Sequence, residues 1–494
     1  MTYGEENRAF AQKIGVPEEV FASATVVLEL PASHAHRHDA RAAFLLAANL
    51  LVRLFHRVHL LAPDVPFGPN PWHLKTLHDA RPILESLSEG SVAWTSPDSA
   101  DVSIGIGSAP CTGARQTVVV GFRRSVVWLD RSSAEGEEDV LAGLIAACYA
   151  ASQTFLHIAA GRGASLAPIQ PFEFFLPTRG HDDAVDIGTV HLAGVGAIGC
   201  ALVYGLAHLP CKGAIVATDD DPVDTTNLHR YVLMRRDDVG KQKVVVAASA
   251  LEGNAVTVEP HVSSYQTYLK SATTRNIQLL VSAVDSEAGR RHLAASLPRR
   301  VVNASTTDRY ITVSRHGFGD GRACLYCLYA PAGGPKTTEH RIAEDLGVGM
   351  LEVERLIAEN APVDAAFVRR VEQHRNVAEG TYAIWVGKPL QSFHQRAVCG
   401  GAAIQMPEGT VVAPLGFISA AAGLLLLADL VGGRSLADEE SRANYLRLDM
   451  FSSPEFADRD VRTPDPTRRC ICGDDDYVYV YRRRYGTGPV SQQL

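Results

Sequence analysis

The stretch HLAGVGAIGCAL, residues 191–202, contains three glycines between an expected strand and an expected helix. Gly194, Gly196 and Gly199 have the spacing G-x-G-x-x-G. In such a loop the first glycine makes the turn, the second lets the backbone approach a phosphate, and the third allows helix and strand to pack closely. The helix N-terminus adds partial positive charge. The pattern predicts a bound nucleotide but does not separate NAD from ATP, and a glycine-rich turn without a ligand is the alternative.

Acidic residues end the next expected strand, KGAIVATDDD. Asp219 follows Gly199 by about twenty residues, which is where a carboxylate that binds the ribose of a nucleotide is expected. Asp221 stands two residues further on. We therefore expect both carboxylates beside the nucleotide.

An amide and two cations follow in DDDPVDTTNLHRYVLMRRDDVGKQKV, namely Asn227, Arg230 and Lys243. A hydride-transfer enzyme keeps its pyrophosphate and does not need this set. Attack of a carboxylate on the α-phosphate of ATP does need it, because charge develops on phosphoryl oxygens and on the departing pyrophosphate. Arginine offers a planar fork to phosphate, and lysine offers a point charge. A solvated surface run is the alternative, and it better suits Arg235, Arg236 and Lys241.

A further carboxylate ends the apolar run IQLLVSAVDSEAGRR. Asp285 stands at the carboxyl end of an expected parallel strand, and such ends face the ligand crevice. This carboxylate could hold Mg²⁺ between phosphates. It could also cap the helix expected to follow, and the two roles are compatible.

Two cysteine pairs indicate a metal centre. Cys324 and Cys327 lie in RACLYCLY, and Cys470 and Cys472 lie in RRCICG. A C-x-x-C pair needs two more ligands to complete a tetrahedral zinc site, and the second pair is the candidate source. We expect structural Zn²⁺ at Cys324, Cys327, Cys470 and Cys472, with the C-x-C pair supplying either two ligands or one ligand beside a different fourth group.

Cys399, in HQRAVCGGAAIQMPEG, is different because no neighbouring cysteine could chelate with it. It lies in a small-residue loop before an apolar helix, and the following glycine leaves its sulfur accessible. A thiolate is a nucleophile, and His394 or Arg396 could favour that form. A buried structural cysteine is the alternative, which we expect instead for Cys148 and Cys200.

Two similar sets of elements are expected to position these residues. Strand, helix and strand succeed one another in TVHLAGVG, AIGCALVYGLAHLP and KGAIVATDDD, and again in ATVVLELPAS, HDARAAFLLAANLLVRLF and HRVHLLAPD. The second set lies in the first half of the chain, and PASHAHRH replaces its glycine loop, so bulky side chains would keep a phosphate away. Apolar helices at residues 137–160 and 413–430 close the two halves.

The expected fold class is α/β, with two domains of the Rossmann type. We place the domains at residues 1–178 and 179–494, with a proline-bearing linker at the junction. Within the second domain, residues 335–395 have helical periodicity and are expected to be a helical insertion, followed by a loop at about 391–412. The alternation in DYVYVYRRRYG predicts a final edge strand.

The composition of the chain argues against some classes of binding partner. The 494 residues are 46% apolar and carry a net charge of −8, which argues against a nucleic-acid partner. The polar start MTYGEENRAF lacks the features of a secretory signal, and the apolar run after residue 413 meets Asp429 too soon to span a bilayer. Nine cysteines then suggest a reducing compartment, so we expect a cytoplasmic protein without a membrane partner.

The motif order resembles that of the ubiquitin-activating-enzyme superfamily, the ThiF/MoeB/HesA adenylating fold. The similarity is strongest over residues 185–330 and extends less clearly to about 475. It implies binding of ATP and Mg²⁺, with Asp219 on the ribose, Asn227, Arg230 and Lys243 on phosphates, and Asp285 serving magnesium. The chain departs from the pattern at Pro222, at the C-x-C pair, and at Tyr231, where many relatives have glutamine.

Members of this superfamily work as pairs of folds, and an arginine from the partner half reaches the nucleotide. The resemblance therefore implies that the first half is an inactive adenylation-like fold packed on an active one as a pseudo-dimer. The chain would then be a monomeric pseudo-dimer or a homodimer of such units. Arg8, just before the first strand, is the candidate for this arginine, and an exposed helical arginine is the competing interpretation.

The resemblance implies adenylation of the C-terminal carboxylate of a ubiquitin-like protein that ends in glycine, capture as a thioester on Cys399, and transfer to a conjugating enzyme. Relatives with an inactive first half occur in bacterial modification systems linked to phage defence, that is, to antiviral defence. The first alternative is adenylation of a sulfur-carrier protein or peptide without that transfer. The others are a nicotinamide-dependent dehydrogenase and a non-catalytic scaffold.

Overall fold

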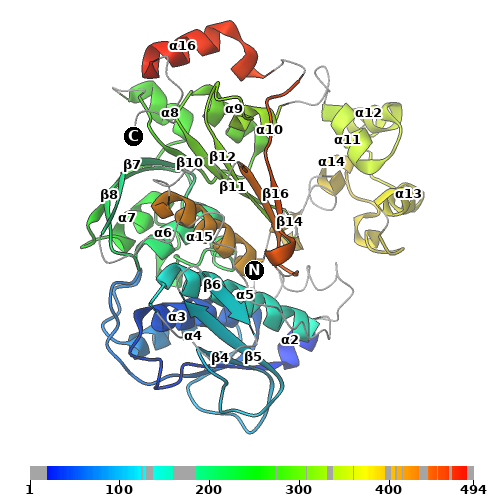
Figure 1. Ribbon diagram of the computed structural model, residues 1–494. Coiled ribbons are helices and arrows are strands. Elements are labelled where there is room, and N and C mark those ends of the chain that lie inside the picture. Colours follow the sequence, from blue (N-terminus) through cyan, green and yellow to red (C-terminus); the bar gives the residue numbers. More distant parts are fainter. Residues whose placement is uncertain are drawn as a thin grey trace. The chain divides into compact units, whose positions relative to one another are not determined.

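The computed structural model describes residues 19–123, 126–129, 137–159, 184–272, 276–307, 309–330, 338–359, 361–375, 377–394, 402–406, 409–413, 415–432, 443–452, 454–466 and 470–486. The chain divides into two compact units. One consists of residues 21–330 and 416–494, and the other of residues 331–415 with the segment before residue 21 (Figure 1). The larger unit contains two β-sheets, and the smaller one is mainly helical.

The first sheet has the strand order β3-β2-β1-β4-β5-β6, in which only the β5–β6 pair is antiparallel. Its strands are β1 (Thr25–Glu29), β2 (Arg57–Leu61), β3 (Ser91–Ala93), β4 (Ala100–Ile106), β5 (Ala114–Arg123) and β6 (Val126–Leu129). The helices of this part are α2 (Glu19–Ser23), α3 (His38–Leu54), α4 (Arg81–Leu87) and α5 (Val140–Ala159). The strand–helix–strand prediction for the first half is confirmed.

The second sheet has the order β16-β15-β12-β11-β10-β7-β8-β9. Its strands are β7 (Val185–Ala193), β8 (Cys211–Thr218), β9 (Val256–His261), β10 (Leu280–Ser282), β11 (Val301–Thr307), β12 (Tyr310–His316), β15 (Tyr445–Asp449) and β16 (Asp458–Asp460). Strands β7 to β11 are parallel, and β12, β15 and β16 extend the sheet in antiparallel fashion. The accompanying helices are α6 (Ala197–Leu206), α7 (Lys243–Ala250), α8 (Tyr265–Ser271), α9 (Glu287–Ala295), α10 (Leu325–Leu328), α15 (Gly416–Gly432) and α16 (Asp475–Tyr485).

The strand order fixes where a ligand can bind. From β7 the chain passes to β8 and β9 on one side, and then crosses to β10 on the other side of β7. The first sheet repeats this arrangement, with β2 and β3 on one side of β1 and β4 on the other. In open sheets of this kind the crevice lies at the carboxyl ends of the two strands where the direction reverses. In the second sheet these are β7 and β10, which precede the glycine loop and Asp285.

Apolar helices fill the space between the two sheets of the larger unit. Helix α15 packs against α5 and α6 and against strands β11 and β12 (Figure 1). Among the described residues, α5 is the one helix long and apolar enough to cross a membrane by length and composition alone, and 83% of its apolar window is buried. Because α5 also contacts α3 and β5, its apolar surface is used inside the protein.

The predicted final edge strand is wrong, because this segment forms helix α16. The side chain of Asp474 accepts hydrogen bonds from the backbone of Asp476 and Tyr477 and so caps the helix. Tyr477, Tyr481 and Tyr485 recur every fourth residue and all pack on one apolar cluster. The alternation of tyrosine and valine hid this helical spacing.

The smaller unit contains α11 (Thr338–Leu346), α12 (Met350–Ala358), α13 (Ala365–Arg375) and α14 (Leu390–Phe393), which confirms helical structure in the 335–395 region. These helices share a core that includes Leu346, Phe367, Trp385 and Phe393. A hairpin of β13 (Ala402–Met406) and β14 (Gly409–Ala413) follows. The predicted nucleophile Cys399 and the predicted Arg8 lie outside the described residues.

Candidate active site and candidate metal centre

The glycine loop has the geometry that its spacing predicts. Gly194 has φ +92°, and a Cβ there would lie 2.8 Å from the carbonyl oxygen of Ala283. A Cβ on Gly199 would overlap the carbonyl oxygen of Gly194, so this glycine permits the close contact of α6 with β7. Of the described residues, a Cβ on Gly196 would meet only Tyr231, whose hydroxyl would lie 3.5 Å away. Gly196 therefore leaves room for a ligand, while the other two glycines shape the turn.

The N-terminus of α6 has no side-chain cap among the described residues, since its cap residue is Gly196. The carboxylate of Asp219 holds the loop from one side. Its two oxygens accept hydrogen bonds from the backbone N–H of Val195, at 2.7 Å, and of Asp221, at 3.0 Å. Burial raises the pKa of Asp219, and the nearby Lys243 opposes that shift.

Lys243 is a buried cation within this acidic pair. Its Nζ lies 2.9 Å from Asp221 Oδ2 and 3.8 Å from Asp219 Oδ1. Burial lowers the pKa of Lys243, but Tyr231 and the two carboxylates raise it by more, so the net shift is upward. The lysine is therefore charged at neutral pH. A triphosphate would offer it oxygens in place of the exposed Asp221.

Arg230 and Lys243 lie near the same aromatic ring. The guanidinium carbon of Arg230 and the Nζ of Lys243 are each 5.5 Å from the centre of the Tyr231 ring. Burial lowers the pKa of Arg230, although Asp285 lies close enough to oppose that shift. Tyr231 thus lies near both cations and beside Gly196. The sequence marked it only as a departure from glutamine and gave no sign of this central position.

Asn227 belongs to a tight capping arrangement. Its Oδ1 accepts from the backbone N–H of Asp224, and the Asp224 side chain accepts from Thr226. Since the amide oxygen is used, the Nδ2 group is the part of Asn227 able to donate to a ligand. At the end of β10, Ser286 caps α9 through its hydroxyl, so the exposed carboxylate of Asp285 does not serve as that cap.

Three side chains of the first half hold the segment that follows Tyr231. Asn49 Nδ2 donates to the carbonyl of Val232 at 2.8 Å, and Arg53 Nη2 donates to that of Met234 at 3.2 Å. Trp72 Nε1 donates to the carbonyl between them, on Leu233, at 3.0 Å. We call Asn49, Arg53 and Trp72 the clamp. The clamp could not be predicted from the sequence, because contacts between residues more than 160 positions apart leave no local pattern.

The corresponding crevice of the first half is occupied by carboxylates. Glu138 Oε2 accepts from the backbone N–H of His38, the first residue of α3, and Asp39 Oδ1 accepts from that of Ala40. At the end of β1, Glu29 accepts from the backbone N–H of Cys111 at 2.7 Å. Asp39 is in turn ion-paired with Arg37 at 2.6 Å. Charged side chains therefore occupy the helix terminus of the first half, whereas the second half has a glycine cap there.

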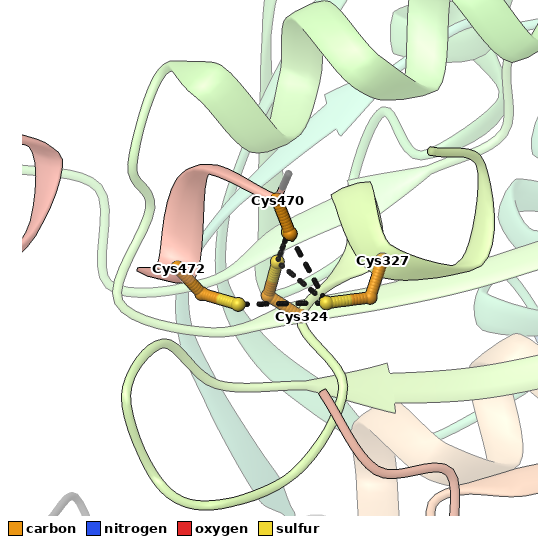
Figure 2. A group of neighbouring side chains, drawn as sticks. All are labelled: Cys324, Cys327, Cys470 and Cys472. Atoms are coloured by element: carbon orange, nitrogen blue, oxygen red, sulfur yellow. Dashed lines mark hydrogen bonds between the residues drawn. The ribbon is translucent and has the colours of Figure 1, made fainter. Parts of the chain in front are cut away.

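The four predicted metal ligands come together (Figure 2). The sulfurs of Cys324, Cys327, Cys470 and Cys472 all lie within 4.8 Å of one another. The sulfur of Cys327 lies 3.7 Å from that of Cys324, 3.1 Å from that of Cys470 and 3.4 Å from that of Cys472. A zinc ion with four Zn–S bonds of about 2.3 Å requires sulfurs about 3.8 Å apart, so the cluster fits zinc with small outward shifts.

The C-x-C pair therefore supplies both of its thiols to the cluster. Other cysteines have a different environment. Cys148 and Cys200 are fully buried on α5 and α6, and burial raises the pKa of both thiols. These two are structural residues, as predicted.

In the smaller unit, His394 Nε2 lies 2.7 Å from Asp345 Oδ2.

Residues 172–470 match the ThiF family. The uncharacterized protein y4jF of Sinorhizobium fredii is 35% identical over 357 residues, which are 69% of each chain. Human ubiquitin-like modifier-activating enzyme 7 is 35% identical over 118 residues, 21% of this chain but only 11% of that enzyme. A crystal structure of E. coli MccB with MccA-N7isoASN aligns at 15% identity with a TM-score of 0.34, over 66% of this chain and 75% of that one.

Proposed function

Because the chain belongs to the ThiF family, we propose that it uses ATP to activate the C-terminal carboxylate of a ubiquitin-like protein that ends in glycine. The observation that carries the proposal is the pairing of Arg230 and Lys243 around Tyr231, directly beside the open glycine loop. The similarity to a ubiquitin-like modifier-activating enzyme supports the choice of substrate class.

In the first step, a carboxylate oxygen of the modifier attacks the α-phosphorus of ATP. The bond from that phosphorus to the bridging oxygen breaks, and pyrophosphate leaves as an acyl-adenylate forms. Backbone N–H groups at the start of α6 face the phosphates, and Arg230 and Lys243 stabilise the charge on the transferring and departing oxygens. Asn227 donates to a phosphate, Asp219 binds the ribose, and Asp221 releases Lys243 to the ligand.

Asp285 is the residue that would hold magnesium. It is an exposed carboxylate at the end of β10, close to Arg230. Carboxylate oxygens suit Mg²⁺, which shields the charge of the phosphates when bound. The four-cysteine cluster would hold Zn²⁺, whose contribution is to cross-link the segments before α10 and α16.

In the second step, the thiolate of Cys399 attacks the acyl carbon of the adenylate, AMP leaves, and a thioester results. A conjugating enzyme then accepts the acyl group. His394 stands five residues before Cys399, and its contact with Asp345 fixes the orientation of its ring. The assignment of the nucleophile rests on Cys399 itself, which lies outside the described residues.

We assign the first half the role of an inactive adenylation-like fold that packs on the active one as a pseudo-dimer. Two observations support this assignment: the shared strand order around β1 and β7, and the carboxylates of Glu138 and Asp39 at the N-terminus of α3. Asp39 is also ion-paired with Arg37, so side chains of the first half already occupy the N-terminus of α3. Arg8 remains the candidate for an arginine contributed to the nucleotide.

A thioester assay tests this function. The chain is incubated with Mg·ATP and a ubiquitin-like protein ending in glycine from the same genome, and adducts are separated with and without reductant. Wild-type protein should form a reducible adduct, whereas Cys399→Ala should form none but retain ATP–pyrophosphate exchange. Exchange without any adduct in the wild type would contradict the thioester step and favour adenylation alone.

A further inference from the structure

A line of buried side chains connects the four-cysteine cluster with the end of strand β10. It consists of Arg290 on α9, Asn303 on β11, and Ser314 and His316 on β12. These four residues are at most 5% exposed. Asn303 and Ser314 are direct partners in the antiparallel register of β11 and β12, and His316 lies on the same face as Ser314. The sheet therefore fixes the middle of the line.

Each member bonds to the next. Arg290 Nε donates to Asn303 Oδ1 at 3.1 Å, and Asn303 Nδ2 donates to Ser314 Oγ at 3.3 Å. Ser314 Oγ lies 2.9 Å from His316 Nε2, and His316 Nδ1 lies 2.7 Å from the carbonyl oxygen of Ala323. Ala323 immediately precedes the cluster residue Cys324. One end of the line is thus a backbone group attached to the cluster.

The other end is the backbone of the nucleotide crevice. Arg290 Nη2 donates to the carbonyl of Val284 at 2.5 Å, and its Nη1 donates to that of Asp285 at 3.4 Å. These carbonyls hold the turn that carries the Asp285 carboxylate. Arg290 also lies with its guanidinium carbon 5.1 Å from the centre of the Tyr329 ring, which limits its movement.

The direction of every hydrogen bond in the line is determined. A carbonyl can only accept, so His316 Nδ1 must donate to Ala323, and the Nε2 of the neutral ring must accept from the hydroxyl of Ser314. Burial lowers the pKa of His316 to about 4, so the ring is neutral at physiological pH. The Ser314 oxygen then accepts from Asn303, whose amide oxygen accepts from Arg290. Each donor is satisfied in one arrangement, which makes the line cooperative.

From this geometry we infer that Arg290, Asn303, Ser314 and His316 are positioning residues that couple metal binding at the four-cysteine cluster to nucleotide binding at Asp285. With the metal bound, the segment of Ala323 is fixed and the line holds the Asp285 turn. When the metal leaves, the carbonyl of Ala323 can shift, and each buried donor must then rearrange or lose its partner. The inference rests on the proposed nucleotide site.

The coupling can be measured as a change in zinc affinity, because the effect of one ligand on the binding of another is reciprocal. If zinc strengthens binding of Mg·ATP, then Mg·ATP must strengthen binding of zinc by the same factor. We therefore measure zinc affinity by competition with a chelator, with and without saturating Mg·ATP. In the wild type we expect Mg·ATP to raise zinc affinity by about fivefold or more, at the lower end of typical coupling.

Ser314→Ala breaks the line at its centre without touching a thiol or a predicted nucleotide ligand. In this variant zinc and Mg·ATP should each still bind, but the effect of one on the other should disappear. Ser419→Ala is the matched control, because Ser419 is equally buried on α15 and its hydroxyl has no partner within the described part of the chain. If Ser314→Ala does not fold, Ser314→Cys keeps a similar volume with a weaker donor and should give reduced coupling.

The outcomes separate this inference from the proposed function. Failure of the wild type to bind Mg·ATP overturns both. Binding of Mg·ATP with unchanged zinc affinity overturns the coupling but leaves the nucleotide site intact. Coupling that survives in Ser314→Ala overturns the assignment to these four residues.

Discussion

Gly196 and Gly199, three residues apart in the loop, must be glycine for different physical reasons. Gly199 is required by packing, since any Cβ there would overlap the carbonyl of Gly194. Gly196 is required only if a ligand approaches, because within the described part of the chain its Cβ would contact Tyr231 alone, at an ordinary distance. Gly199 therefore has a structural role in the motif, and we assign Gly196 a role in ligand binding.

We predict that Gly196→Ala folds as well as the wild type but binds Mg·ATP at least about tenfold more weakly, because a methyl group displaces one charge-assisted phosphate contact. Gly199→Ala should instead lower the free energy of unfolding by about 1–3 kcal/mol, the usual cost of overpacking. Urea unfolding and calorimetric titration of Mg·ATP measure the two effects. Equal ATP affinity in Gly196→Ala and wild type would argue that no phosphate approaches this glycine.

Most site residues could be predicted from the sequence because their signal is local. The glycines, Asp219 and Asp285 stand at strand ends, and the strands are short apolar runs. The two cysteine pairs could be matched by elimination. Tyr231 could not be placed near both Arg230 and Lys243, because that arrangement depends on the tertiary path of the 227–234 segment.

At the scale of elements, the clamp on the 232–234 segment links the first half to the nucleotide crevice. Its three donors reach consecutive backbone carbonyls just after Tyr231. A predicted helix face or strand end gives no indication of such a contact. The same limit explains the error at α16, where tertiary packing of Tyr481 and Tyr485 selected a helix over the strand that alternation suggested.

Trp72→Phe should weaken nucleotide binding although Trp72 is not a predicted ligand. The change keeps an aromatic ring but leaves the carbonyl of Leu233 without its buried donor, at a cost of about 1–3 kcal/mol in unfolding free energy. Displacement of the adjoining Tyr231 and Arg230 should lower affinity for Mg·ATP, which calorimetry measures. We expect the affinity for Mg·ATP to fall by about threefold or more, because small displacements of binding groups weaken binding strongly.

Trp94→Phe provides the control, since the Trp94 indole N–H has no partner within the described residues. It should leave ATP affinity unchanged. Identical ATP affinity in Trp72→Phe and Trp94→Phe would show that the first half does not position the crevice.

At the scale of the whole molecule, the two halves meet around a buried histidine. His208 of the second half lies with its ring 5.9 Å from Phe67 and 5.7 Å from His38, both of the first half. Burial holds the pKa of His208 well below its ordinary value of 6.5. The folded protein therefore keeps this ring neutral at pH values where the unfolded chain would protonate it.

The lowered pKa of His208 determines in which direction the stability of the protein changes with pH. Below about pH 6.5 the unfolded chain binds a proton that folded His208 does not, so the stabilising contribution is complete above that pH and declines as the pH falls. We predict a lower melting temperature at pH 5 than at pH 7, and a smaller difference in His208→Phe. The exposed His36→Phe should behave like the wild type. An unchanged pH dependence in His208→Phe would contradict this account of the interface.

Calorimetric titration of Mg·ATP shows whether the crevice of the second half binds a triphosphate through Lys243. Lys243→Gln removes the buried cation, and Lys241→Gln removes a neighbouring lysine that is half exposed. We expect wild type and Lys241→Gln to bind Mg·ATP alike and Lys243→Gln to bind it at least about tenfold more weakly. Equal binding by all three proteins, or no binding of ATP by the wild type, would contradict it.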